Sequence, residues 1–166
     1  MDFAGIYEEF FRRIYAYINC RVGLQAAAED LSSLVFQKAL ARFAQYDPAR
    51  GSHAQWLFGI ARNEVNYHLR KAAILKFIPL DLFGDIFPAD AAAGPGPAET
   101  EARSAALAAA LAELAPKERD LISLKFYSEM NNREIARLTG LGESNVGTIL
   151  YRCMAKLRKR LTGVNI

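Results

Sequence analysis

The sequence predicts an all-α protein built from two small helical domains that a flexible acidic linker joins. Apolar residues recur at helical spacing through most of the 166 residues, and the apolar–polar alternation of β-strands is absent. Charge falls in three blocks: residues 1–80 hold ten Lys/Arg and seven Asp/Glu, residues 81–115 hold one and six, and residues 116–166 hold ten and five. Two basic blocks around an acidic connector indicate two modules that face nucleic acid.

The first block predicts three helices. The first spans about residues 3–21 and ends at Gly23, and the second spans about 26–45. Proline and glycine make residues 46–51 a turn, after which Ser52 can cap a third helix that reaches Lys71. The residues expected to face inward are Ile6, Phe10, Ile14, Tyr17, Ile18, Leu31, Leu34, Val35, Ala39, Phe43, Ala54, Leu57, Phe58, Ile60, Ala61, Val65 and His68.

The other side of the third helix is polar, and Trp56 lies at its boundary. An aromatic ring beside hydrogen-bonding and cationic groups suits single-stranded nucleic acid, because stacking on an unpaired base contributes about 1–3 kcal/mol. The alternative interpretation, that Trp56 is a half-buried core residue, stays open. The polar side carries Ser52, Gln55, Gly59, Arg62, Asn63, Asn66 and Arg70.

Residues 72–88 are unusually apolar for a connector, and residues 89–103 are rich in Ala, Gly, Pro and acid. The apolar stretch is expected to fold back onto one of the domains. The alternative is an exposed docking patch for a partner. The Ala/Gly/Pro-rich stretch is typical of a flexible linker.

The last block predicts a helix-turn-helix after helices at about 100–114 and from Pro116 onward. Asn131 or Asn132 can cap a short helix to Thr139, and residues 140–142 supply the turn into a long helix that reaches Leu161. One side of the long helix is apolar and the other polar and basic, as suits the DNA major groove, although a structural helical hairpin remains the alternative. The apolar side carries Val146, Leu150, Cys153, Leu157 and Leu161, and the polar side carries Asn145, Thr148, Arg152, Lys156 and Lys159.

Other function classes find little support in the sequence. There is no run of about 18 apolar residues for a membrane span and no secretory signal, and the two cysteines lack a CxxC spacing, which fits a reducing cytoplasmic location. His53 and His68 have no zinc-spaced partners, and the prolines of residues 94–97 rule out a phosphate loop. Neither enzyme activity nor a metal or cofactor is therefore expected. A stand-alone helix-turn-helix regulator is the more serious alternative, but it leaves the Trp56 helix unexplained.

Two stretches together resemble a known family. Residues 28–71, with the motif DP-x-RGS-x-x-x-WLF-x-IARN, resemble region 2 of bacterial sigma factors, and the stretch from Leu114 to Leu161 resembles region 4. The order of these two stretches, with a short linker and no region 3 between them, resembles that of the extracytoplasmic-function (ECF) group. The resemblance implies region 2 at residues 1–75, a linker at 76–103 and region 4 at 104–166. It also implies that the protein binds core RNA polymerase through its clamp and flap, recognises the −10 and −35 promoter elements, promotes melting and is controlled by an anti-sigma factor.

The resemblance also implies roles for individual residues. Hydrogen-bonding side chains would discriminate base edges, while cations would fix position on phosphates. The loop at residues 47–53 would capture a flipped base, which costs a few kcal/mol of unstacking. The implied contacts are Ser52, His53, Gln55, Trp56, Arg62, Asn63 and Asn66 at −10; Arg133, Glu143, Ser144, Asn145, Thr148, Arg152 and Lys156 at −35; and Asp30, Phe36 and Gln37 on polymerase.

The chain departs from the family pattern at several positions. A frequent Arg is Gly59 here, a usual capping Ser is Gly142, and a Gln-Glu pair is Ser33-Leu34. Gly147 and Ile149 occupy positions that are often basic, which predicts two lost phosphate contacts and a flatter salt dependence, by about 0.9 log unit per contact.

Overall fold

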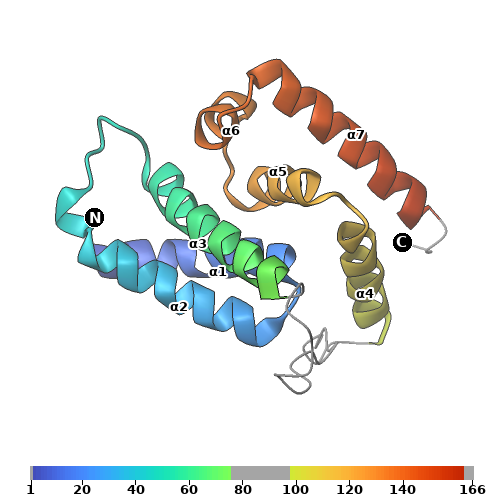
Figure 1. The fold of residues 1–166 in the computed structure, drawn as a ribbon, viewed down its shortest axis with the longest axis horizontal. Helices are drawn as coiled ribbons and strands as arrows, with labels where there is room; N and C mark the ends of the chain where they lie inside the picture. Colours follow the sequence, from blue (N-terminus) through green and yellow to red (C-terminus); the bar gives the residue numbers. More distant parts are fainter. Residues whose placement is uncertain (1, 76–97, 163–166) are drawn as a thin grey trace.

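The computed structural model describes residues 2–75 and 98–162. Within these ranges there are helices and no strands, which confirms the all-α prediction (Figure 1). The α-helices are α1 (Phe3–Val22), α2 (Gln25–Ala41), α3 (His53–Leu75), α4 (Ala98–Ala112), α5 (Pro116–Tyr127), α6 (Asn132–Thr139) and α7 (Glu143–Leu161), with a short 3₁₀ helix at Phe43–Gln45.

Helices α1, α2 and α3 pack on one another as a bundle. Asp2 caps α1 by accepting a 3.0 Å hydrogen bond from the Gly5 amide, and Gly23 ends it in the left-handed region with φ 71°. Apolar side chains at helical spacing face the interior, as the sequence predicts. Those fully enclosed include Ile6, Ile14, Ile18, Val35, Leu57, Phe58 and Val65.

The second helix ends earlier than predicted. It stops at Ala41 because the Arg42 amide turns toward the carbonyls of both Lys38 and Ala39, and the chain then tightens into the 3₁₀ turn. This turn brings Phe43 against Phe3, with ring centroids 5.5 Å apart, and 6.5 Å from Trp56. Phe43 is therefore half-buried and supports the start of α3.

The helices α4 to α7 form the second half. Helix α7 packs against α4, α5 and α6 through Val146, Leu150, Cys153 and Leu157, four of the five residues predicted to face inward. Asn131 caps α6: its side chain accepts from the Glu134 amide at 2.9 Å, and Gly140 ends the helix with φ 74°. Gly142 precedes α7 without a side-chain cap, as the missing Ser predicts.

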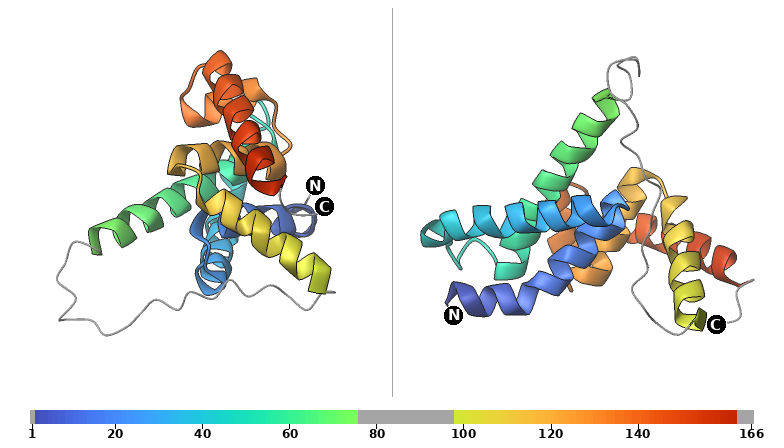
Figure 2. Two further views of the ribbon diagram at one scale, coloured as in Figure 1. Left: turned by 90° about the vertical axis from the view of Figure 1, so that its right-hand side faces the viewer. Right: turned by 90° about the horizontal axis from the view of Figure 1, so that it is seen from below.

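The two halves contact each other through α1 against α5 and α3 against α6, and their buried apolar residues form one cluster. Figure 1 shows α5 and α6 above the α1–α3 bundle, and Figure 2 shows α7 on the far side of α5 and α6 from that bundle. Consequently α7 leaves its outer face uncovered, while part of α3 faces the second half.

The helices on either side of the connector have slightly different bounds from those predicted. Helix α3 continues to Leu75, beyond the predicted end at Lys71, and α4 begins at Ala98 and ends at Ala112, each about two residues early. The remaining connector, residues 76–97, lies outside the described residues. The interpretations of the apolar stretch 72–88 and of the linker therefore stay predictions for those positions.

Candidate nucleic-acid interface

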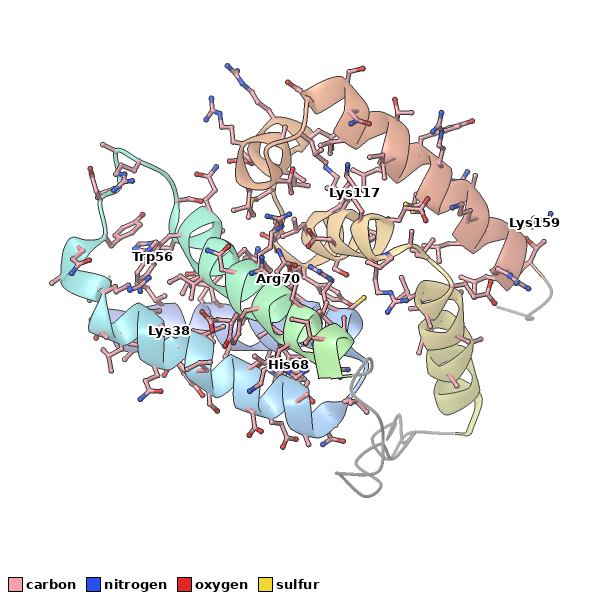
Figure 3. The ribbon with its side chains drawn as sticks, viewed as in Figure 1. Lys38, Trp56, His68, Arg70, Lys117 and Lys159 are labelled. Atoms are coloured by element: carbon pink, nitrogen blue, oxygen red, sulfur yellow. The ribbon has the colours of Figure 1, made fainter. Side chains whose placement is uncertain are left out.

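The outer face of α7 is open and polar. Glu143, Ser144, Asn145, Thr148, Arg152 and Lys156 are exposed there, and Arg133 is exposed on α6. The Thr148 hydroxyl donates to the Ser144 carbonyl at 3.0 Å, so its proton is already used within the helix. Asn145, beside it, keeps a side-chain amide that can bind a base edge. The helix thus presents hydrogen-bonding groups near its start and cations farther along; Figure 3 marks Lys159 near its end.

Lys156 already has an ionic partner in this structure. Its ammonium lies 2.6 Å from Glu118 Oε1 of α5, and this hydrogen bond is the main cause that lowers the pKa of Glu118. Lys156 must leave this pair, or share it, to contact a phosphate. Arg152 is therefore the more available cation of the two.

Gly147 and Ile149, the positions interpreted as lost phosphate contacts, lie at the edge of the outer face of α7. A Cβ built on Gly147 would lie 3.5 Å from the Asn132 side chain, so this position faces α6. Ile149 is partly buried against the core. Both positions therefore border the packed side of α7, and the reduced salt dependence stays a prediction.

The turn before α3 is held in a defined shape. Tyr46 donates from its hydroxyl to the Gly51 carbonyl at 2.9 Å, and Asp47 accepts from the Ala49 amide at 2.9 Å. Ser52 and Gln55 form a reciprocal capping box at the start of α3, with bonds of 3.3 and 3.2 Å. The capping role predicted for Ser52 is confirmed.

Aromatic rings gather beneath this turn. His53 stacks on Tyr46 with ring centroids 4.3 Å apart, and Trp56 lies 5.2 Å from Tyr46. Figure 3 labels Trp56 near the start of α3. Trp56 is partly buried and packs against the core, which agrees with the interpretation of a half-buried core residue. The rest of its side chain remains accessible, and stacking on an unpaired base stays a prediction.

Farther along α3, two candidate −10 residues are already engaged. Arg62 Nε donates to Asp120 Oδ2 of α5 at 2.8 Å, and Asn66 Oδ1 accepts from Arg21 Nη2 at 3.0 Å. Asn63 instead points outward and is exposed. In this arrangement part of the polar side of α3 therefore faces an internal interface with the second half.

Asp120 is the centre of that interface. It is 5% exposed, and besides Arg62 it pairs with Arg21 and accepts a 2.9 Å hydrogen bond from the Tyr17 hydroxyl. Arg21 also donates to that hydroxyl at 2.9 Å. Burial, together with the Asp120 charge, raises the pKa of Tyr17, so the phenol stays neutral and donates to the carboxylate.

A second bridge joins the starts of α3 and α6. Gln55 Nε2 donates to Glu134 Oε1 at 2.9 Å, while Glu134 Oε2 accepts from the Asn131 amide at 2.8 Å. Each of these glutamine and glutamate side chains belongs to the capping box of its own helix. Two helix caps are thus bonded back to back across the interface.

The three candidate polymerase-binding residues on α2 differ in their exposure. Asp30 and Gln37 are exposed, but Phe36 is 5% exposed and packs against the rings of Tyr7 and Phe11 at 4.8 and 5.9 Å. Phe36 therefore supports the α2 surface from inside instead of presenting its ring to a partner.

The sequence did not point to Tyr17, Arg21, Asp120 or Glu134 as site residues. Arg21 follows Tyr17 by one helical turn, and a charged residue in phase with buried positions signals a buried partner. That signal does not say which carboxylate the partner is. Among the described residues, no cluster of His, Cys, Asp and Glu could hold a metal ion, and no helix is long and apolar enough to cross a membrane.

Comparison with known proteins places both halves in one family. The Sigma-70 region 2 family matches residues 6–74, and the Sigma-70, region 4 family matches residues 104–157. The ECF RNA polymerase sigma factor RpoE of Cereibacter sphaeroides is 31% identical over 166 residues, covering 96% of this chain and 86% of the relative. SigM of Bacillus subtilis is 26% identical over 158 residues, at 95% and 94% coverage. BldN of Streptomyces coelicolor is 30% identical over 161 residues, and although this is 96% of the chain, it is 60% of that relative's length.

Solved structures share the fold. The sigma factor RpoE in its complex with the anti-sigma factor NepR from Bartonella quintana has a TM-score of 0.80 at 23% identity, covering 99% of both chains. CnrH in complex with the cytosolic domain of CnrY has a TM-score of 0.67 at 22% identity, covering 98% of this chain and 89% of that one.

The two matched regions, in this order and over most of the chain, define a sigma factor of the sigma-70 type. The chain belongs to the ECF group of RNA polymerase sigma factors.

Proposed function

We propose that this chain binds core RNA polymerase, recognises −10 and −35 promoter elements and promotes melting, under the control of an anti-sigma factor. The observation that carries the proposal is the pairing, in one chain, of an uncovered polar α7 face with a preformed aromatic turn at the start of α3. A stand-alone regulator would need only the first of these two features. Because polymerase and promoter DNA are its partners, the protein would work in the cytoplasm.

The −35 role rests on α7. Asn145 and Ser144 lie exposed at its start, where a recognition helix meets base edges, and Arg152 lies two turns farther along. An amide such as that of Asn145 can form a bidentate contact with adenine, and a good pair of this kind discriminates by about 1–3 kcal/mol. Glu143 and Thr148 complete the edge, while Arg133, Arg152 and Lys156 would position the helix on phosphates.

The −10 role rests on the turn and on α3. Ser52 and His53 lie where the turn enters α3, and Trp56 offers part of its ring in the first turn of that helix. Gln55, Arg62, Asn63 and Asn66 continue the polar side of α3. A turn already fixed by Tyr46 and by the Ser52–Gln55 capping box lowers the ordering cost of holding an extruded base.

Contacts with proteins would use other surfaces. We assign polymerase binding to the exposed Asp30 and Gln37 of α2, with Phe36 supporting them from the core. Control by an anti-sigma factor is supported by the fold shared with RpoE and CnrH, both solved in complexes with the partners that their descriptions name.

In vitro transcription tests the proposal. The purified chain, added to core polymerase on a promoter library, should direct initiation from promoters that share two short elements separated by a fixed spacer. Initiation without such elements would contradict it. Binding of the chain alone, as a dimer, to a palindromic duplex would instead favour the stand-alone regulator.

Variants separate the two elements. Asn145→Ala should relax specificity at one −35 base, and Arg152→Ala should lower the salt slope of binding by about 0.9. Asn63→Ala should weaken opening at −10. Arg12→Ala and Asn19→Ala remove the same kinds of side chain from exposed sites on α1 and serve as matched controls. Equal behaviour of variants and controls would refute the residue assignment.

Trp56 needs a milder change than alanine because its ring also supports the turn. Trp56→Leu keeps apolar volume against Tyr46 and Phe43 but loses most of the stacking surface. A loss of promoter opening with normal helix content would support the stacking role, whereas normal opening would remove it.

A further inference from the structure

Helices α4, α5 and α7 surround an apolar groove that contains none of the residues proposed to contact DNA or polymerase. The groove has a volume of about 630 Å³ and extends to Cys20 near the end of α1. Figure 1 shows these three helices together in the second half of the molecule. The apolar lining of the groove includes Leu107, Leu111, Phe126, Met154, Leu157 and Leu161.

Large apolar side chains of this groove are open to solvent. Phe126 is 61% exposed and Leu107 is 43% exposed. The polar atoms beside them already have partners, since the Ser123 hydroxyl lies 2.6 Å from the Arg119 carbonyl and 3.0 Å from Cys20 Sγ. An exposed apolar surface of this kind marks a site of interaction. The groove therefore favours an apolar occupant over a polar one.

The connector between the halves contains an apolar segment of matching chemistry. Residues 77–87 read FIPLDLFGDIF, which gives seven large apolar side chains in eleven residues. Burying one large apolar side chain shifts an equilibrium by about tenfold or more. The apolar segment therefore gains free energy if it covers an apolar surface, and the groove is such a surface on the same chain.

The apolar segment is tethered to a wall of the groove. The connector leaves α3 at Leu75 and enters α4 at Ala98, and α4 contributes Leu107 and Leu111 to the lining. Extended, residues 76–97 can span up to about 70 Å, which is longer than the ~34 Å of α3. A tether of this length keeps a segment at an effective concentration on the order of 1 mM. Even a weak contact with the groove is therefore populated.

The charges of the segment and of the groove are complementary. Residues 77–87 contain Asp81 and Asp85 and no Lys or Arg. Arg158 of α7 lines the groove and is exposed, and Lys159 follows it near the end of the helix (Figure 3). Two carboxylates in an apolar segment thus match two cations beside an apolar groove.

We propose that residues 77–87 occupy the apolar groove of their own chain, with Asp81 and Asp85 toward the end of α7. The bound segment covers Phe126 and Leu107 and shields Cys20 from reagents. A protein partner that uses this face must displace the segment first. The contact does not depend on promoter recognition, so it can be measured on the full chain without polymerase.

Alkylation of Cys20 measures whether the groove is occupied. Cys20 is partly exposed and lines the groove, whereas the other cysteine, Cys153, is buried. The full chain is treated with iodoacetamide, and mass spectrometry of its peptides follows the two cysteines separately. Because burial raises the pKa of the Cys20 thiol, all rates are compared at one pH.

A double variant removes apolar side chains from the segment. Phe83→Ser/Phe87→Ser should be alkylated at Cys20 at least about tenfold faster than the parent. Leu40→Ser/Tyr67→Ser removes two exposed apolar side chains from α2 and α3, outside the groove, and serves as the matched control with a parent-like rate. A synthetic peptide of residues 76–88, added at millimolar concentration, should restore protection of the double variant. The same peptide with both serines should not.

A second variant keeps every apolar side chain. Asp81→Asn/Asp85→Asn should raise the Cys20 rate about two- to fivefold at low salt, and the increase should fade at high salt. This variant decides the test if circular dichroism shows that Phe83→Ser/Phe87→Ser has lost helix content.

A parent-like Cys20 rate in the folded serine variant would overturn the proposal, as would a peptide of residues 76–88 that restores no protection. If the serine variant unfolds, a parent-like rate in Asp81→Asn/Asp85→Asn at low salt overturns it instead. Protection of the parent that grows with protein concentration would assign the groove to a second copy of the chain, and would also overturn the proposal.

Discussion

Removing the Tyr17 hydroxyl should destabilise the protein measurably. This hydroxyl donates to Asp120 Oδ1 and accepts from Arg21 Nη1, each at 2.9 Å, and the residue is fully buried. A hydrogen bond to a charged group contributes about 1.5–3 kcal/mol. Arg21 and Asp120 remain paired in Tyr17→Phe, so the loss should be close to one such bond, about 2 kcal/mol.

Urea denaturation measures this loss. With a slope of about 1–3 kcal/mol per molar urea, the midpoint should fall by roughly 1 M. Trp56, the single tryptophan, reports on α3 by fluorescence, and far-ultraviolet circular dichroism reports on all helices. Tyr151→Phe removes a hydroxyl from a residue 78% exposed and should change stability by less than about 0.5 kcal/mol.

The reasoning would be refuted by a Tyr17→Phe midpoint equal to that of Tyr151→Phe. That result would mean that the hydroxyl makes no net contribution to the buried network. A lower urea midpoint by circular dichroism, with an unchanged midpoint by Trp56 fluorescence, would mean that the two halves unfold separately.

Three further predictions concern pH and capping. The pKa of Tyr17 in the folded protein is raised above its ordinary value of 10.0, so the free energy of unfolding should fall as pH rises above about 10. In alkaline urea titrations, Tyr17→Phe should lose less of this free energy than the parent does. Because the pKa of Glu118 is lowered by Lys156, the stability that this pair contributes should be present above about pH 4.3 and lost as pH falls further, a loss that Glu118→Gln should lack. Asn131→Ala removes the α6 cap and should cost about 1 kcal/mol in urea melts, whereas Asn19→Ala on exposed α1 should cost almost nothing.

Local features of the fold were predictable because neighbouring residues determine them. The cap at Asn131, the helix end at Gly140 and the start of α5 at Pro116 each follow from side chains within a few positions. The 3₁₀ turn after α2 was missed, because Phe43 kept the helical spacing while its position is set by Phe3 and Trp56.

The interface between the halves could not be predicted in the same way. Tyr17 and Asp120 are 103 positions apart, and nothing in either local pattern names the other. Arg62 and Asn66 have the composition of an open DNA-binding face, yet here they bond within the protein. Composition identifies what a side chain can bind, but long-range packing decides what it does bind in a given state.

The two oxygens of Glu134 have an unexpected genetic consequence. One oxygen completes the cap of the helix before α7, and the other holds Gln55 at the base of the aromatic turn. A substitution at this single position would disturb the supports of both promoter readers at once. In a mutant screen it would score as a change at both promoter elements, although its side chain need not touch either one.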